Sequence, residues 1–359
     1  MRGHLLGILL SSSLLLACAA SEPPPAAPPA SPAPPPAPVA VVTPPPADTT
    51  PPAPEPTPEE KKKAEADKQL KDERAKWQEA YKVEIARWTP EVHAAAKALA
   101  SKPYPSLHAA MTAVLAGPQR KPGDAQRDAQ RHPQETLAFF GVRPSMTVLE
   151  VGPGEGWYTE ILAPTLAARG KLIDTTNDPN GPEDSPGAFA GQRFKAMLDK
   201  APEVFGKVQT LVVDGKAPKL DPLSGNVDAV LLMREVHGMI NGGTLDAWLV
   251  EIRKALKTGG VLGIEEHRAK PDADPLASSK NGYVPEKWLI EHIEGAGFKL
   301  AGKSEINANP KDTKDYAEGV WVLPPTLQLG AKDREKYMAI GESDRMTLKF
   351  VKVADKKTK

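Results

Sequence analysis

A glycine-rich run is the part of this sequence whose residues and spacing indicate chemistry most directly. Glu150-Val151-Gly152-Pro153-Gly154-Glu155-Gly156 reads E-x-G-x-G-x-G. It stands between a short apolar segment with strand character, 148–151, and a segment with helical character, 158–168. Glycines in such a turn adopt positive φ and let the backbone approach a ligand closely. The run therefore predicts a ligand-binding loop between a strand and a helix.

The spacing excludes two other glycine-rich motifs. A dinucleotide fingerprint reads G-x-G-x-x-G, and its third glycine would fall where this chain has Trp157. A P-loop needs a Lys-Ser/Thr pair after the glycines, and none follows here.

Polar side chains follow two further apolar segments, at positions suited to acid–base chemistry. Glu235 and His237 come after the first segment and His267 after the second. We expect His237 to act as a base or to orient a substrate, with Glu235 and His267 as the next candidates. Alternatively, these groups hydrogen-bond loops around a sheet. No close ligand pair such as H-x-H or H-E-x-x-H is present, so we expect no metal site from His237, Glu265 and His267.

The segments around these residues alternate between strand and helix patterns. Apolar strand patterns occur at 148–151, 171–176, 208–213, 227–233, 261–264 and 346–353. Helical spacing occurs at 158–168, 189–200, 245–256 and 285–293. This order predicts an α/β fold with a parallel sheet covered by helices on both faces. Ligands of such sheets bind beyond the carboxyl ends of the strands, where the strand order reverses.

The glycine run resembles the first motif of class I S-adenosylmethionine-dependent methyltransferases. Further runs resemble a poorly characterised group of predicted, often exported bacterial methyltransferases: Arg127-Asp128, Arg131-His132-Pro133, Thr136 to Gly141, Gly154 to Leu162, Gly263 to Arg268, and Asp344 to Phe350. The resemblance covers residues 91–352 and implies a Rossmann-like class I methyltransferase sheet with S-adenosylmethionine (SAM) as cofactor. It does not imply a substrate, because a fold does not determine function.

The resemblance also implies roles for individual residues. Gly152, Gly154 and Gly156 would pass under the methionine portion and ribose of SAM, and Glu150 would orient the loop or the methionine amine. An acid near the end of the second strand would bind the ribose. Thr176 stands where this acid is expected, so Asp178 is the first choice and Asp174 the reserve. Asp214 would contact the adenine. Each aspartate has an alternative role in a turn or a helix cap.

Several residues beside the glycine loop have two interpretations. Trp157 and Tyr158 could line a pocket, but aromatic residues there more often pack into the core. Arg127, Asp128 and His132 either close over the cofactor or cap a helix with local salt bridges.

The N-terminus resembles a bacterial lipoprotein signal. Residues 5–16 are apolar but shorter than the about 20 residues of a membrane span, which is typical of an export signal. Leu15-Leu16-Ala17-Cys18 resembles a lipobox, and Cys18 is the only cysteine. We expect a signal peptide at 1–17 and a lipidated Cys18; the alternative is an ordinary signal peptide cut nearby. Ala19 favours the outer membrane, facing the periplasm, by resemblance to other lipoproteins.

Composition divides the rest of the chain. Of the 39 prolines, 18 lie between residues 23 and 58, so 18–58 is expected to be a disordered Pro/Ala-rich linker. Residues 59–118 read as a helical, charged segment, 119–353 as the methyltransferase-like domain and 354–359 as a basic tail.

Charge and cysteine content exclude some functions and leave others open. Because 46 basic residues balance 46 acidic ones, we expect no nucleic-acid partner, and membrane contact only through the lipid. The sequence predicts an envelope-tethered methyltransferase whose acceptor is a small molecule or an envelope component. Two alternatives remain: a non-catalytic binding module, and a structural envelope lipoprotein that retains the fold.

Overall fold

The computed structural model describes residues 56–354, which belong to one compact unit. Cys18, the signal peptide and most of the Pro/Ala-rich linker lie outside the described residues, as does nearly all of the basic tail. Within 56–354, no helix is long and apolar enough to cross a membrane.

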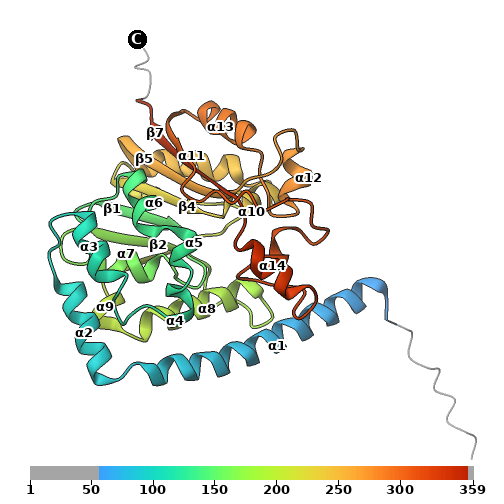
Figure 1. Cartoon of the computed structure of the whole chain (residues 1–359), viewed down its shortest axis with the longest axis horizontal. Helices are drawn as coiled ribbons and strands as arrows, with labels where there is room; N and C mark the ends of the chain where they lie inside the picture. The colour runs from blue at the N-terminus through green and yellow to red at the C-terminus, as the bar shows by residue number, and fades with distance from the viewer. Residues whose placement is uncertain (1–55, 355–359) are drawn as a thin grey trace, which may run out of the picture. The chain divides into compact units, whose positions relative to one another are not determined.

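A seven-stranded sheet forms the centre of this unit (Figure 1). Its strand order is β3-β2-β1-β4-β5-β7-β6. The strands are β1 (Thr147–Val151), β2 (Lys171–Thr176), β3 (Gln209–Val212), β4 (Val227–Met233), β5 (Leu256–His267), β6 (Phe298–Ser304) and β7 (Arg345–Lys352). β1 to β5 pair in parallel, whereas β7 runs antiparallel to both β5 and β6. The strand order reverses between β1 and β4, which is where such sheets bind ligands.

The α/β fold with a Rossmann-like sheet is confirmed, but the all-parallel sheet is wrong at one end. β7 inserts antiparallel between β5 and β6, and no strand was predicted at 298–304. After the buried Phe298, β6 alternates exposed and partly buried residues at the sheet edge, a weak signal beside the strongly apolar interior strands. β5 is also longer than its apolar centre at both ends: Leu256 pairs with Val227 of β4, and Glu265 to His267 continue to pair with β7.

Helices cover both faces of the sheet and bury two apolar clusters. One face carries α2 (Pro90–Ser101), α3 (Leu107–Val114), α6 (Pro133–Phe140), α7 (Thr159–Leu166), α8 (Pro186–Asp199) and α9 (Pro202–Phe205). The other carries α10 (Val236–Asn241), α11 (Leu245–Ala255) and α13 (Glu286–Gly295). Shorter elements connect them: α4 (Pro122–Ala125), α5 (Asp128–Arg131), η1 (Asp221–Leu223), α12 (Pro275–Ser279), η2 (Gly319–Val322) and α14 (Arg334–Ile340).

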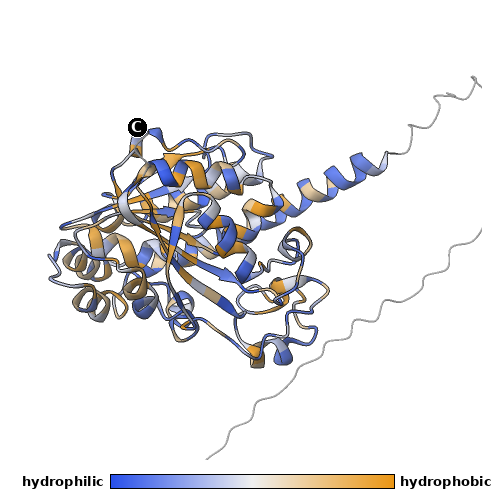
Figure 2. Ribbon diagram, turned by 90° about the horizontal axis from the view of Figure 1, so that it is seen from above, coloured by the Kyte–Doolittle hydropathy of each residue, from blue (hydrophilic) through white to orange (hydrophobic). Residues whose placement is uncertain are grey.

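A long helix, α1 (Pro58–Arg87), precedes this core. Thr57 and Glu60 form a capping box at its first turn: the Glu60 amide donates to Thr57 Oγ1, and the Thr57 amide donates to Glu60 Oε2. Figure 2 shows its first turns beyond the globular body and almost wholly hydrophilic. α1 ends before Trp88, and α2 begins two residues later, because Thr89 caps α2 and Pro90 occupies its first position.

The second half of α1 packs against α8. Trp77 meets Phe189 edge-on with ring centroids 5.8 Å apart, and the Tyr81 hydroxyl donates to the Ala196 carbonyl at 3.0 Å. Glu84 accepts from Lys200 at 2.8 Å and also from Arg87. Burial alone would raise the pKa of Glu84, but the hydrogen bonds from these two cations lower it to about 2. The ionised Glu84 therefore helps hold α1 on the domain.

Candidate functional site

A cavity of about 250 Å³ opens where the strand order reverses. The carboxyl ends of β1 and β2, the loop after β3 and the segment after β4 all contribute to its wall. Its lining includes Gly152, Thr176, Asn177, Val213, Glu235 and Trp248. The parallel order of β1 to β5 brings these residues together from distant parts of the sequence.

The three glycines of the loop have positive φ but different surroundings. Gly152 has φ +65°, its amide donates to Thr175 Oγ1 at 3.0 Å, and a Cβ there would lie 2.5 Å from Glu235 Oε2. Gly154 has φ +60°, and a Cβ there would meet nothing within 4 Å. A Cβ on Gly156 would lie 2.7 Å from Met197 Cε. Of the three, Gly152 alone lines the cavity, and Gly156 serves packing against α8.

Glu150 lies beneath the loop, inside the protein. It pairs in register with Asp174 on β2, and both side chains are buried. The Thr159 hydroxyl, at the start of α7, lies 3.0 Å from Glu150 Oε2 and 3.4 Å from Asp174 Oδ2. Burial raises the pKa of Glu150 to about 7, and burial together with Glu150 raises that of Asp174. Glu150 is thus placed to anchor the loop to α7, and Asp174 lies within the sheet.

The two exposed aspartates expected to bind the cofactor lie outside the cavity wall. Asp178 Oδ1 accepts from the Asn180 amide, and Asp214 Oδ1 accepts from the Lys216 amide, both at 2.9 Å. These are local turns, in which a carboxylate satisfies a backbone donor two residues later. At the end of β2 the cavity wall holds Thr176 and Asn177, and after β3 it holds Val213 and Gly215, the residues on either side of Asp214. The ribose role of Asp178 and the adenine role of Asp214 remain predictions.

Glu235 faces the cavity at the first turn after β4. Its carboxyl group lies against Gly152, so each constrains the other. Burial raises the pKa of Glu235 to about 8, although the nearby His237 lowers it in part. A largely protonated carboxyl group at this position can donate one hydrogen bond to a ligand.

His237 and His267 both contact the side chain of Glu266. Glu266 Oε1 lies 3.1 Å from His237 Nδ1 and accepts from the His267 amide at 2.8 Å, while Oε2 accepts from the His237 amide at 3.1 Å. The two imidazole centroids are 5.5 Å apart. Burial lowers the pKa of His237, but Glu266 outweighs it and the net pKa is raised. Burial and the neighbouring His237 lower the pKa of His267 well below its usual value.

Glu265, the preceding residue, is engaged elsewhere. Its Oε1 accepts from Arg234 Nη1 at 3.0 Å and lies 2.7 Å from Arg345 Nε, and its Oε2 accepts from the Tyr158 hydroxyl at 3.2 Å. Successive residues of a strand point to opposite faces, so Glu265 and Glu266 enter different networks. Glu265 is therefore a poor candidate for a base or a metal ligand.

The residues flanking the loop have structural roles. Trp157 is buried, and its indole NH donates to the Asp124 carbonyl at 2.8 Å. Arg127 pairs with Asp124, and Asp128 pairs with Arg120 at 2.8 Å. Arg127 and Asp128 thus form local salt bridges, the second of the two roles considered for them.

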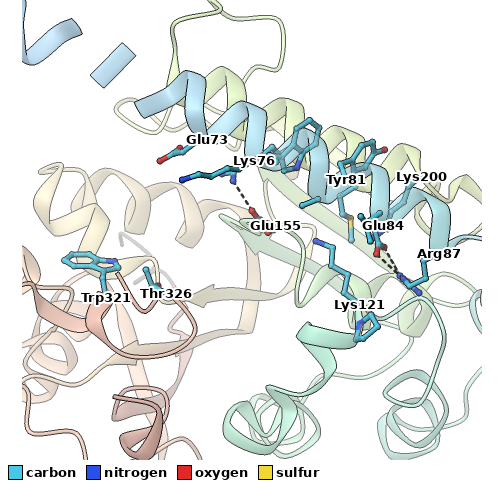
Figure 3. A pocket seen from close by; sticks show the side chains of 16 residues that line it. Glu73, Lys76, Tyr81, Glu84, Arg87, Lys121, Glu155, Lys200, Trp321 and Thr326 are labelled. Carbon is cyan, nitrogen blue, oxygen red and sulfur yellow. Dashed lines mark hydrogen bonds and ion pairs between the residues drawn. The ribbon is translucent and has the colours of Figure 1, made fainter. Parts of the chain in front are cut away.

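A larger cleft, of about 1320 Å³, separates α1 from the segment around η2 (Figure 3). Residues of α1 line one side, and Trp321 and Thr326 face them across the cleft. Cationic and aromatic side chains make up half of the wall, among them Lys76, Trp77, Tyr81, Lys121, Arg193 and Trp321, and two glutamates of α1, Glu73 and Glu84, also line it. Glu155 of the glycine loop also lines it, and the Trp321 ring lies 6.3 Å from the His237 ring. The cleft therefore reaches both the loop and the histidine cluster.

Sequence reasoning missed several residues of this region. Glu266 and Ser343 hold the histidines, Thr175 holds the loop, and Trp248 and Trp321 line the two hollows. Thr175 could have been found as the neighbour of Thr176, at the end of a strand that precedes a ligand site. No local pattern points to Ser343 or Trp321, because only the tertiary fold brings them to the site.

Comparison with known proteins gives similarity in structure only. No protein-family model matches the sequence, and a search of curated proteins finds no match. A SAM-dependent methyltransferase from Aquifex aeolicus has 21% sequence identity over 51% of this chain and 87% of its own, with a TM-score of 0.40. The glycopeptide N-methyltransferase MtfA, solved with S-adenosylhomocysteine, has 15% identity over 63% and 90%, with a TM-score of 0.40.

A protein with another activity is also among the similar structures. The cyclase SpnF has 19% identity over 64% of this chain and 84% of its own, with a TM-score of 0.46. At these identities and TM-scores, the likeness assigns neither an activity nor a ligand to this chain.

Proposed function

We propose that this chain is a SAM-dependent methyltransferase tethered to the bacterial envelope. The observation that carries the proposal is the cavity at the point where the strand order reverses, with Gly152 and Glu235 in its wall. Gly152 has the positive φ and the lack of a side chain that a close backbone approach requires. The resemblance of the glycine run to the first methyltransferase motif agrees with this position.

The wall suggests how SAM would be held. Thr176 and Asn177 offer a hydroxyl and an amide at the end of β2, where the ribose hydroxyls would bind. Val213 and the Trp248 ring offer apolar surface for the adenine. Bound SAM supplies the activated methyl group. The residues of the chain then need chiefly to hold the acceptor in line with that group and to exclude water.

The large cleft is our candidate for the acceptor site. Its aromatic and cationic wall fits an acceptor that combines a ring or an acyl chain with an anionic group. The Trp321 ring, in the wall of the cleft, lies next to the ring of His237, the first candidate for orienting or deprotonating the acceptor. Because α1 forms one side of the cleft, we propose that the helix contributes to acceptor binding as well as to tethering.

Calorimetric titration with SAM and S-adenosylhomocysteine tests the cofactor site, and the full chain in detergent is the material of choice. We expect micromolar binding of both ligands. Absence of binding at millimolar ligand would refute the methyltransferase proposal. Mass spectrometry of the N-terminal peptide tests the tether: lipid on Cys18 supports it, and an unmodified Cys18 in the membrane fraction contradicts it.

A further inference from the structure

A side-chain cluster beside the cavity has the composition of a metal site. One ligand atom each from His237, Glu266 and His267 lies within 4.8 Å of the other two. Two imidazoles and one carboxylate are a ligand set that holds divalent transition metals and leaves coordination positions open. We propose that His237, Glu266 and His267 bind one divalent transition-metal ion.

The separations suit such an ion after a small adjustment. Metal–ligand bonds of about 2.1 Å place neighbouring tetrahedral ligands about 3.4 Å apart. His237 Nδ1 and Glu266 Oε1, at 3.1 Å, already have nearly this separation. The two remaining separations are each at most 4.8 Å and must shorten by at most about 1.4 Å, which side-chain rotation can supply.

The surroundings hold the ligands in orientation. Two backbone amides, those of His237 and His267, donate to the Glu266 carboxylate. His267 Nδ1 lies 2.5 Å from Ser343 Oγ, a contact that leaves its Nε2 free to coordinate. Hydrogen bonds of this kind orient metal ligands and set their tautomers. His237 and His267 are partly buried as residues, and Glu266 between them is fully buried.

The position of the cluster gives the metal a place in the reaction, and this step rests on the proposed function. Glu235 and Gly238, which flank His237 in sequence, line the SAM cavity, and Trp321 connects His237 to the cleft. A metal ion there would act as a Lewis acid on an oxygen or nitrogen of the acceptor and lower its pKa. It would take the place of His237 as a free base, because His237 would then be one of its ligands. The acceptors expected are therefore small molecules with a metal-coordinating hydroxyl or amine group.

Zinc titration of the full chain tests the proposal. The protein is purified in detergent, stripped with a chelator and titrated with Zn²⁺ against a chromophoric competitor. We expect one ion per chain, bound at sub-micromolar concentration. Replacement of Zn²⁺ by Co²⁺ should give visible d–d absorption typical of nitrogen and oxygen ligands.

Four variants locate the site. Glu266→Gln and His267→Ala should weaken zinc binding about a hundredfold or more, and Ser343→Ala about tenfold. His292→Ala is the matched control, because His292 Nε2 pairs with Asp246 Oδ1 at 2.7 Å, its ring stacks on Trp288, and it is not one of the three cluster residues. It should bind zinc like the wild type.

Two results would overturn the proposal: a stripped wild type that takes up no stoichiometric zinc or cobalt, or Glu266→Gln and His267→Ala variants that bind zinc as tightly as His292→Ala. SAM titration of the same samples checks folding and separates the two proposals. Zinc uptake without SAM binding leaves the metal site standing while the methyltransferase proposal fails. SAM binding without zinc uptake would leave the methyltransferase proposal standing and overturn the metal site.

Discussion

Alanine substitution at two glycines of the loop separates cofactor binding from backbone strain. Gly152 and Gly154 have nearly equal positive φ, +65° and +60°. A side chain at such φ costs about 1–2 kcal/mol, so Gly152→Ala and Gly154→Ala should share this loss of stability. They differ in what the new methyl group meets: Glu235 Oε2 at 2.5 Å in the first case and nothing within 4 Å in the second.

The difference sets the expected magnitudes. To relieve the contact, Glu235 must leave its rotamer, at a further cost of about 0.5–1.5 kcal/mol. The unfolding free energy should therefore fall by about 1–2 kcal/mol in Gly154→Ala and about 1.5–3.5 kcal/mol in Gly152→Ala. The methyl group and the displaced carboxyl also occupy the cavity, so Gly152→Ala should lose at least about tenfold in SAM affinity, or about 1.4 kcal/mol.

Urea unfolding and SAM calorimetry measure both effects on the same samples. Gly154→Ala should keep SAM affinity within about threefold of the wild type, because Gly154 does not line the cavity and its new methyl group would meet nothing within 4 Å. Equal losses of affinity in the two variants would refute this account of the loop. So would wild-type affinity in Gly152→Ala.

Three further predictions concern stability. The pKa of Glu84 is about 2 in the folded chain, so its stabilisation is complete above pH about 4.5 and is lost as the pH falls toward 2. At pH 6, Glu84→Gln should unfold with about 1–2 kcal/mol less free energy than the wild type, a value that allows for the partial solvation of Glu84. This difference should narrow on acidification, and a difference that does not change with pH would contradict the role given to Glu84. Burial raises the pKa of Glu150 to about 7, so the folded form keeps a proton that the unfolded form loses. As the pH rises from about 4.5 to 7, the unfolding free energy of the wild type should fall by up to about 3 kcal/mol more than that of Glu150→Gln. Equal pH dependence of the two proteins in urea unfolding would contradict this prediction. Gly263→Ala places a Cβ 2.7 Å from the Phe140 ring and should cost about 1–3 kcal/mol in urea unfolding, whereas Gly295→Ala, with open space, should lie near the wild type.

Much of the fold could be read from local patterns. Apolar segments of strand length, helical spacing and glycine stops are properties of a few consecutive residues, and they located β1, β2, β4, α7 and α11. The glycine run was recognised for the same reason, since its turn depends on its own residues. The weak edge strand β6 and the antiparallel direction of β7 were not readable, because strand pairing depends on distant segments.

The amino-acid sequence by itself determined that a glycine loop follows a buried strand and that polar side chains follow two later strands. Only the tertiary structure decided which of these side chains meet. The register of β4 with β5, which pairs Met233 with Glu265, brings His237 to Glu266 and His267. Local turns, by contrast, keep Asp178 and Asp214 out of the cavity wall. The physical reason is that strand order and register set the distances across a sheet, and they depend on packing of the whole chain.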